Sequence, residues 1–272
     1  MKMWHLLVDD IPLKGSLNMA IDEFLFNSLT DEPQTCVRFY RWERPTISIG
    51  YSQNVTQAVN LDFCRSHGID VVRRITGGKL VLHHQEVTYS ICSSDTGIFT
   101  QTLKDSYRLI SLALMRGLEK MGLQPVLAAE TPSDYVRKSL LCFSHPAQNE
   151  VEVGGKKIVG SAQKRMGSRF LQHGSIPMAY EKELLESVSI QKKKEPVRIT
   201  SLNESLGQKV DFTWAVRNLT DGISEYFGIS FSPKVFNDRE MGVIHRIQVE
   251  KYARTAWTFG PERVQSPEEP LG

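Results

Sequence analysis

The amino-acid sequence predicts a mixed α+β fold, with a largely antiparallel sheet flanked by helices. Three observations lead to this expectation. Several segments alternate apolar and polar residues with a period of two, as strands do. Two long segments instead carry apolar residues at helical spacing. The chain also shows no repeat, no heptad array and no parallel β-α-β rhythm, which argues against a solenoid, a coiled coil and a doubly wound sheet.

The first elements are a helix and a hairpin. Residues 16–29 have apolar side chains at helical spacing, with Ser16 available as the N-terminal cap, and predict a buried amphipathic helix. Residues 37–42 and 46–51 alternate with period two around the turn Glu43-Arg44-Pro45, which predicts a half-buried hairpin.

The same two patterns predict the elements that follow. They are a short helix near residues 60–67, strands over 69–72 and 87–92, a long helix over 102–121, a hairpin over 150–162 and a strand over 169–176. The pair Gly154-Gly155 suits the tight turn of this second hairpin. Residues 129–147 have little periodicity and many small or polar side chains, so we expect a long loop, which in compact domains is usually functional or mobile.

We expect three parts in the chain. Residues 1–190 form the core domain, which contains all the motifs described below, and a lysine-rich run after residue 190 marks its edge. Residues 191–258 carry two further helical stripes and predict a helical extension packed on the core. Residues 259–272 are rich in Pro, Glu and Gly and are expected to be disordered.

Composition excludes several classes of protein. With 272 residues, 40% of them hydrophobic, the chain can bury a full core. Its net charge of +2 argues against nucleic-acid binding, which needs concentrated positive charge. The N-terminus is apolar for only a few residues before Asp9 and Asp10, which indicates neither a signal peptide nor a membrane span. We therefore expect a cytoplasmic protein.

The segment from residue 73 to residue 90 is the most informative part of the sequence. Gly77-Gly78 follows the pair Arg73-Arg74, and such a turn can bring backbone N–H groups against an acyl carbonyl or a phosphate. A nucleotide-binding loop is excluded, because Arg73 stands where the first glycine should be and Leu80 where the Mg²⁺-binding hydroxyl should be. The run His83-His84-Gln85-Glu86 lacks the spacing of a zinc-protease helix, so no metal is expected.

Cys142 is a candidate nucleophile. Cys36, Cys64, Cys92 and Cys142 show no Cys-x-x-Cys spacing, so most should be reduced core thiols. Cys142 differs because it lies in the irregular stretch, although it too could be a small buried residue. Its thiolate would need a nearby cation, either Lys157 or His145. Lys157 could instead be an exposed turn lysine beside Lys156, and spacing alone leaves these alternatives open.

Three motifs together carry a resemblance to a known family. The first is Arg73-Arg74-x-Thr76-Gly77-Gly78 with His83 and Thr88-Tyr89-Ser90, the second runs from Gly155 to Arg165, and the third is Leu171-Gln172-His173-Gly174-Ser175-Ile176. Almost the whole chain resembles the family of lipoate-protein ligases A and octanoyltransferases, which shares its fold with biotin protein ligases. The resemblance implies an acyl-binding loop in the first motif and a central functional lysine at Lys157. The substrate-binding residues that it implies are Arg73, Arg74, Thr76, Gly77, Gly78, His83, Gly160, Ser161, Ala162 and His173.

The family contains ATP-dependent ligases and cysteine-dependent octanoyltransferases. This chain is most similar to the Bacillus-type octanoyltransferases, because Cys142-Phe143 and Pro146 precede the Gly-x-Lys hairpin. The sequence after the lysine-rich run also leaves little room for the accessory domain that ligases usually have. Other features depart from this pattern: Asn149-Glu150 is similar to the Asn-Asp of ligases, His84 replaces an Asp, and Lys79 and Leu80 replace smaller residues.

The resemblance implies an acyltransferase of lipoate biosynthesis. Octanoyl-acyl-carrier protein would be the donor, Cys142 would carry a thioester, and a lysine of a lipoyl domain such as the glycine-cleavage H protein would be the acceptor. No cofactor is expected, and ATP and Mg²⁺ would be needed only by a ligase. A monomer is expected, with no nucleic-acid or membrane partner. The alternatives are an ATP-dependent lipoate-protein ligase, an amidotransferase between lipoyl domains and a non-catalytic protein that binds lipoyl domains.

Overall fold

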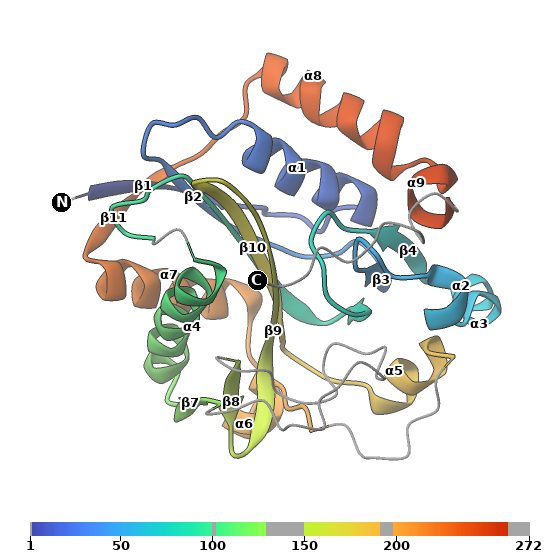
Figure 1. Ribbon diagram of the computed structural model, residues 1–272. Coiled ribbons are helices and arrows are strands. Elements are labelled where there is room, and N and C mark those ends of the chain that lie inside the picture. The colour runs from blue at the N-terminus through green and yellow to red at the C-terminus, as the bar shows by residue number, and fades with distance from the viewer. Residues whose placement is uncertain (1, 100–101, 129–149, 191–197, 261–272) are drawn as a thin grey trace.

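The computed structural model describes residues 2–99, 102–128, 150–190 and 198–260, and every structural statement below refers to these residues (Figure 1). An eight-stranded sheet forms its centre, in the order β11-β1-β2-β6-β10-β9-β8-β7. Its strands, in chain order, are β1 (Lys2–Val8), β2 (Thr35–Tyr40), β6 (Glu86–Ser93), β7 (Pro125–Leu127), β8 (Val151–Val153), β9 (Lys156–Met166), β10 (Arg169–Pro177) and β11 (Ile229–Pro233). Strand β1 is parallel to both of its neighbours, and the other neighbouring strands are antiparallel.

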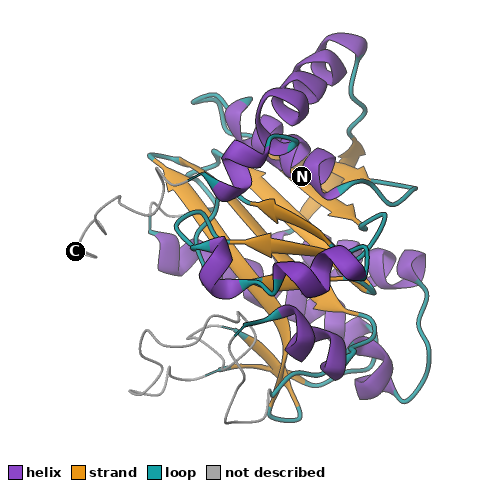
Figure 2. Ribbon diagram, turned by 90° about the vertical axis from the view of Figure 1, so that its right-hand side faces the viewer, coloured by secondary structure: helices purple, strands orange, loops and turns teal. Residues whose placement is uncertain are grey.

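Helices cover both faces of this sheet (Figures 1 and 2). Helices α4 (Leu103–Lys120) and α7 (Phe212–Phe227) pack on one face, where they share a core with apolar side chains of β2, β6 and β10. Helix α1 (Gly15–Asn27) packs on the other face, together with α8 (Asp238–Ile247). Gly117 and Gly222 allow α4 and α7 to approach closely, because a Cβ at Gly222 would lie 2.2 Å from the Gly117 nitrogen. The prediction of an α+β fold with a largely antiparallel sheet flanked by helices is confirmed.

A three-stranded sheet adjoins this core, in the order β4-β3-β5. It consists of β3 (Thr46–Ile49), β4 (Asp70–Arg73) and β5 (Val81–His83). Its apolar residues pack with the short helices α2 (Val55–Ala58), α3 (Leu61–Ser66) and α5 (Lys182–Val188). The predicted helix near residues 60–67 and the predicted second hairpin are both present, the latter as β8 and β9.

The predicted hairpin of residues 37–42 and 46–51 is wrong. Strand β2 pairs with β1 and β6 of the large sheet, whereas β3 pairs with β4 and β5 of the small one. All residues of β2 and β3 are buried. Each strand has a hydrogen-bonded partner on both sides, so the two strands do not pair with each other. The turn at residues 43–45 therefore leads the chain from one sheet to the next.

The sequence also failed to predict the parallel strands at the edge. Chain segment β1-α1-β2 is a parallel crossover, although no such rhythm was visible in the sequence. Only Trp4 and Leu7 of β1 are buried, so its apolar alternation is weak. Ser16 was expected to cap α1, but Lys14 is the N-cap residue and makes no side-chain capping bond.

The C-terminal part contributes a strand as well as helices. Only helices were predicted for residues 191–258, but β11 joins the large sheet beside β1. The helices in this part are α6 (Leu202–Leu206), α7, α8, a π-helical turn η1 (Gln248–Tyr252) and α9 (Thr255–Phe259). Of the predicted disordered tail, Phe259 ends α9 and the residues after Gly260 lie outside the described part. The division of the chain at residue 190 stays a prediction.

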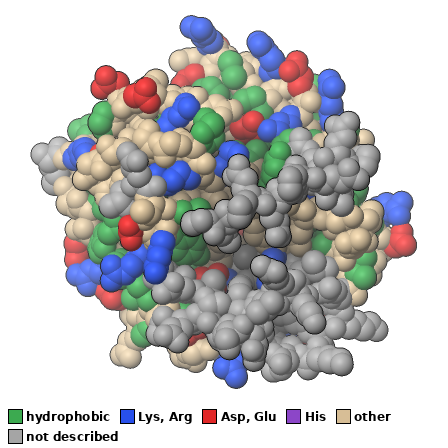
Figure 3. Space-filling view, viewed as in Figure 1, with side chains coloured by type: hydrophobic (Ala, Val, Ile, Leu, Met, Phe, Trp, Pro, Cys, Tyr) green, Lys and Arg blue, Asp and Glu red, His purple; other side chains and the backbone are tan. Residues whose placement is uncertain are grey.

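The described surface carries charges of both signs. Figure 3 shows basic and acidic side chains on the same face, in keeping with the small net charge. None of the described helices combines the length and the apolar character needed to cross a bilayer.

Candidate active site

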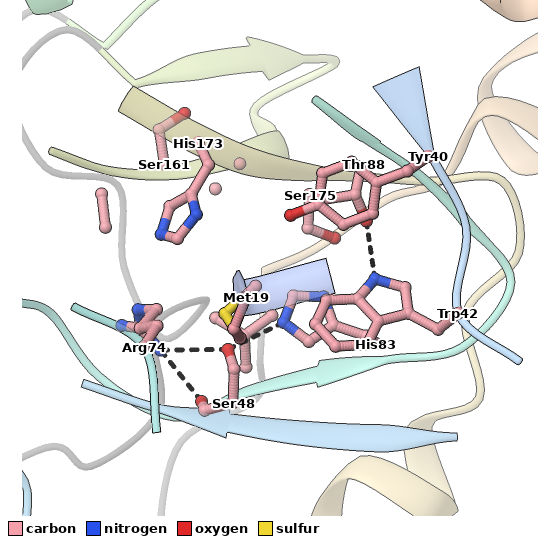
Figure 4. A pocket seen from close by; sticks show the side chains of 14 residues that line it. Met19, Tyr40, Trp42, Ser48, Arg74, His83, Thr88, Ser161, His173 and Ser175 are labelled. Carbon is pink, nitrogen blue, oxygen red and sulfur yellow. Dashed lines mark hydrogen bonds between the residues drawn. The ribbon is translucent and has the colours of Figure 1, made fainter. Parts of the chain in front are cut away.

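A pocket lies between the large and the small sheet, beside α1 (Figure 4). It holds about 350 Å³ of empty space, part of it open to solvent. The residues that line it come from α1, from β2 and the turn after it, from both sheets and from the start of the loop that joins β4 to β5, residues 74–80, here called the glycine loop. They are Met19, Tyr40, Trp42, Ser48, Arg74, Val81, His83, Thr88, Gly160, Ser161, Ala162, His173, Gly174 and Ser175.

Two rows of residues cross four strands and form the large-sheet side of the pocket. In the first row, neighbouring Cα positions join Tyr40, Thr88, Ser175 and Gly160. In the second row they join Arg38, Ser90, His173 and Ala162. Alternate residues of a strand point to the same face, so both rows face α1 and the pocket. The next row on this face, Cys36, Cys92 and Leu171, is apolar and packs against α1.

Asp22 on α1 is the centre of a buried hydrogen-bond network. Its Oδ1 accepts bonds from Arg38 Nη1 and Ser90 Oγ, both at 2.9 Å. Its Oδ2 accepts bonds from the Tyr40 hydroxyl and from His173 Nδ1, both at 3.0 Å. Burial raises the pKa of this carboxyl group, but the His173 hydrogen bond and the Arg38 charge outweigh that effect and hold the pKa below its ordinary value.

His173 connects this network to the glycine loop. Burial lowers the pKa of its imidazole, and the charge of Arg74 adds to that effect while Asp22 opposes it. The neutral ring donates from Nδ1 to Asp22 and accepts at Nε2 from the Thr76 hydroxyl, at 2.7 Å. The Thr76 oxygen in turn accepts from Arg74 Nε at 3.1 Å. His173 of β10 thus holds Thr76, near the start of the glycine loop, in place.

A second network surrounds Glu86, the first residue of β6, and reaches the pocket through His83, Thr88 and Ser175. Glu86 Oε1 accepts from His83 Nδ1 at 2.8 Å and from the Thr88 hydroxyl, and Oε2 accepts from Ser175 Oγ at 2.6 Å. Burial raises the pKa of this carboxyl group, but the charge and hydrogen bond of His83 and the two hydroxyl donors outweigh it, so the pKa is lowered. The His83 ring stacks on Trp42 at a centroid distance of 4.0 Å, and Trp42 Nε1 donates to Thr88 Oγ1 at 2.8 Å (Figure 4).

The two networks meet at Arg74 and Ser48. His83 Nε2 lies 2.7 Å from Ser48 Oγ, which also accepts from Arg74 Nη1 at 3.1 Å (Figure 4). Arg74 Nη2 donates to the carbonyl oxygens of Gly77 and Lys79, both at 2.8 Å. The guanidinium group therefore holds the backbone of the glycine loop in place. The polar side-chain atoms of the two networks are hydrogen-bonded to one another. Such a pocket can hold an apolar chain without leaving these buried polar groups unpaired.

Arg73 and Arg74 have different surroundings. Arg73 is 2% exposed, and its guanidinium group donates to five carbonyl oxygens, those of Gly50, Tyr51, Gln53, Trp257 and Thr258. It is not among the described residues that line the pocket. Of the two glycines, Gly78 has a φ of 89°, a conformation that favours glycine, and both are exposed.

Lys157, at the start of β9, is fully buried. Its Nζ lies 2.6 Å from Glu150 Oε1, and Glu150 is 5% exposed. Its backbone bonds to Arg198 and Thr200, on either side of Ile199, which lines a second cavity together with Ser175. Lys157 is not among the described residues that line the first pocket. The prediction of an exposed turn lysine, left open by the sequence, is wrong.

Three of the four cysteines are buried thiols. Burial raises the pKa of Cys36 to about 12 and of Cys64 to about 11, and it raises that of Cys92 well above the ordinary value. Each is a free cysteine. Such thiols stay protonated near neutral pH and are poor nucleophiles. The fourth cysteine, Cys142, and its neighbour His145 lie outside the described residues.

The pocket therefore brings together most of the predicted substrate-binding residues. Arg74, His83, Gly160, Ser161, Ala162 and His173 line it, Thr76 bonds to His173, and Gly78 lies beside Ala162. Sequence reasoning missed Asp22, Glu86, Ser48 and Trp42. A signal existed for Asp22, since this charged residue stands at helical spacing from the apolar residues Met19, Leu25 and Phe26. Among the described residues, no group of three or more His, Cys, Asp or Glu side chains is placed to hold a metal ion.

Comparison with known proteins gives consistent results. Residues 14–224 match the lipoyl protein ligase A/B catalytic domain. The chain is 33% identical to the octanoyltransferase LipM of Clostridioides difficile, covering 93% of this chain and 97% of that protein. It is 35% identical to the octanoyltransferase LipM of Carboxydothermus hydrogenoformans, covering 95% and 99%. A solved structure of a bi-partite lipoate protein ligase and its E2 lipoyl domain from Thermoplasma acidophilum is similar in fold, with a TM-score of 0.80 and 22% identity over 99% of this chain and 100% of that chain.

Proposed function

The chain belongs to the lipoyl protein ligase A/B catalytic domain family, and we propose that it is an octanoyltransferase of lipoate biosynthesis. The relatives with this name match nearly the full length of both chains at 33–35% identity. The likeness to solved ligases does not decide between a ligase and an octanoyltransferase, because at 22% identity it shows the fold alone. The donor would be octanoyl-acyl-carrier protein, and the acceptor a lysine of a lipoyl domain such as the glycine-cleavage H protein.

The pocket between the two sheets is the proposed site for the octanoyl chain. Burial of its six methylenes at about 0.8 kcal/mol each supplies roughly 5 kcal/mol of binding free energy. The polar groups around the pocket are bonded to one another, so an apolar chain can lie against them without breaking these bonds. Backbone N–H groups of the glycine loop are suited to the acyl carbonyl.

The single observation that carries the thioester proposal is the state of the cysteines. Cys36, Cys64 and Cys92 are buried thiols with raised pKa values, which leaves Cys142 as the candidate nucleophile of this four-cysteine chain. We propose that the Cys142 thiolate attacks the carbonyl carbon of the donor thioester. The carrier's C–S bond breaks, and its sulfur leaves as a thiol after taking up a proton.

The second half of the reaction transfers the acyl group to nitrogen. The acceptor lysine amine attacks the Cys142 thioester, an amide bond forms, the amine loses a proton and the Cys142 thiolate is released. Lys157 would favour the thiolate and help to neutralise the developing oxyanion, and the ion pair with Glu150 would hold its ammonium group in place. The thioester is already activated, so the proposal needs neither ATP nor a metal.

Intact-mass measurement tests this proposal directly. The protein, octanoyl-acyl-carrier protein and an apo H protein are incubated without ATP, and all three masses are recorded. We expect an octanoyl adduct on the enzyme that hydroxylamine removes, followed by octanoylation of the H protein. Cys142→Ala should abolish both, whereas Cys64→Ala, which removes a buried thiol of α3, should retain both.

Other outcomes identify the alternative activities. Undiminished transfer by Cys142→Ala would contradict the thioester. Modification that requires lipoate and ATP would indicate a ligase, and transfer only from an already octanoylated H protein would indicate an amidotransferase. Tight binding of the H protein with no transfer from any donor would indicate a binding protein.

A further inference from the structure

The C-terminal segment formed by α8, η1 and α9 lies beside α1 and the small sheet (Figure 1). It lies beyond residue 224, where the match to the family's catalytic domain ends. Its side chains nevertheless reach elements that form the pocket, from two directions.

The middle of the segment, η1, is attached to α1. Lys251 Nζ lies 2.7 Å from both carboxylate oxygens of Glu23, and the Tyr252 hydroxyl donates to Glu23 Oε2 at 2.5 Å. Gln248 Nε2 donates to Ser16 Oγ at 3.0 Å. These bonds fix η1 on the helix that supplies Met19 and Asp22 to the site.

The C-terminal end of the segment, α9, is attached to the strand that leads into the glycine loop. Arg73 Nε donates to the Trp257 carbonyl oxygen at 3.1 Å, and Arg73 Nη2 to that of Thr258 at 2.7 Å. In return, Trp257 Nε1 donates to the Arg73 carbonyl oxygen at 2.8 Å. All three residues are at least 91% buried, so water does not compete effectively for these reciprocal bonds.

The same guanidinium group holds the turn that supports the loop. Arg73 Nη1 donates to the carbonyl oxygens of Gly50, Tyr51 and Gln53, at 3.0, 2.8 and 2.8 Å. This turn touches the loop directly, because Tyr51 N donates to the Thr76 carbonyl oxygen at 2.9 Å. A Cβ on Gly50 would lie only 2.0 Å from the Gly78 oxygen.

We infer that Arg73 and Trp257 are positioning residues, which tie the C-terminal segment to the glycine loop and keep the loop in its acyl-binding form. Arg73 acts through the turn at residues 50–53, and Trp257 acts through Arg73. The inference rests on the proposed acyl transfer, since it assigns a role in that reaction to residues that do not line the pocket. Arg73 would thus position the glycine loop from outside the pocket, whereas Arg74 lines the pocket itself.

The test removes one hydrogen bond and keeps an aromatic ring at position 257. Trp257→Phe loses the indole N–H, so a smaller fraction of molecules should hold the loop in the binding form. The KM for octanoyl-acyl-carrier protein should rise about fivefold while kcat stays within about twofold, because saturating donor restores the bound form. Amide hydrogen exchange over residues 74–80 should become faster. Arg73→Lys should have a larger effect, because one ammonium group cannot replace the five bonds of the guanidinium.

Trp214→Phe is the matched control, because Trp214 is 38% exposed on α7, away from the pocket, and its substitution should change neither KM nor exchange in the loop. A Trp257→Phe enzyme with lowered thermal stability but unchanged KM and unchanged loop exchange would overturn the inference. If the wild-type protein shows no transfer, the proposed function fails instead, and hydrogen exchange still reports on the attachment of the loop.

Discussion

Nζ of Lys157 and Oε1 of Glu150 lie 2.6 Å apart, and both side chains are buried. Removing one partner takes its countercharge away from the other buried group, which typically costs about 3–5 kcal/mol. Lys157→Met should therefore unfold at a lower urea concentration than the wild type and should also lose octanoyl transfer. Urea titration and the intact-mass assay measure these two effects separately.

The double variant Glu150→Gln/Lys157→Met separates structure from chemistry. It removes both charges, so most of the lost stability should return. Transfer should not return, because the proposed role needs the ammonium group. An active double variant would contradict a catalytic role for Lys157 and leave it as one half of a structural ion pair.

Stability should depend on pH through His173. Burial holds the pKa of His173 below its ordinary value of 6.5. Just below pH 6.5 the unfolded chain therefore binds more protons at this residue, so stability should fall as pH falls, by at most about 1.4 kcal/mol per pH unit. His173→Gln should lack this contribution and show a flatter dependence in urea titrations across that window. Asp22 acts in a separate window, because its lowered pKa costs stability only as pH falls below 3.8. Parallel curves for the two proteins would show that His173 titrates equally in both states.

The contact between Gly50 and the glycine loop predicts a strong steric effect. Gly50→Ala would place a Cβ 2.0 Å from the Gly78 oxygen, and backbone must move to relieve the clash. We expect a loss of about 1–3 kcal/mol of stability and a weaker binding of donor. Gly242→Ala is the control, since nothing lies within 4 Å of its new Cβ and it stands inside α8, where alanine is favoured by up to about 1 kcal/mol. Equal unfolding midpoints for both variants would contradict the close approach.

Alkylation should distinguish the cysteines. Because burial raises the pKa values of Cys36, Cys64 and Cys92, iodoacetamide near neutral pH should leave them unmodified in the native protein. Cys142 should react under the same conditions if it is the nucleophile, and peptide mass mapping identifies the labelled site. Native labelling of Cys92 at the rate seen in denaturant would contradict its burial.

The glycine loop and the second hairpin could be predicted because their signals are local. Gly154 and Gly155 both have positive φ, and residues 150–153 before them alternate in sequence as strands do. The hairpin predicted around Glu43-Arg44-Pro45 failed because alternation identifies a strand without identifying its partner. In the fold, β2 pairs within the large sheet and β3 within the small one.

The site was predictable only in part, for a similar reason. Motif residues such as Arg74 and His83 are recognisable in sequence, but Asp22 acquires its role from donors on three strands of the sheet. No local pattern states that Arg38, Ser90 and His173 face one helix. Arg73 shows the opposite problem. The motif identified this residue as a substrate-binding candidate, but its side chain bonds to Trp257 and Thr258, far along the chain.

The row that joins Tyr40, Thr88, Ser175 and Gly160 has a consequence for how acyl preference can change. Each member lies directly opposite the next on the neighbouring strand, so a larger side chain at one position needs a smaller one beside it. Substitutions at these positions should therefore covary among homologues although the positions are far apart in sequence. A library that seeks a new acyl chain length should accordingly randomise cross-strand pairs such as 88 and 175, and leave consecutive positions of one strand unchanged.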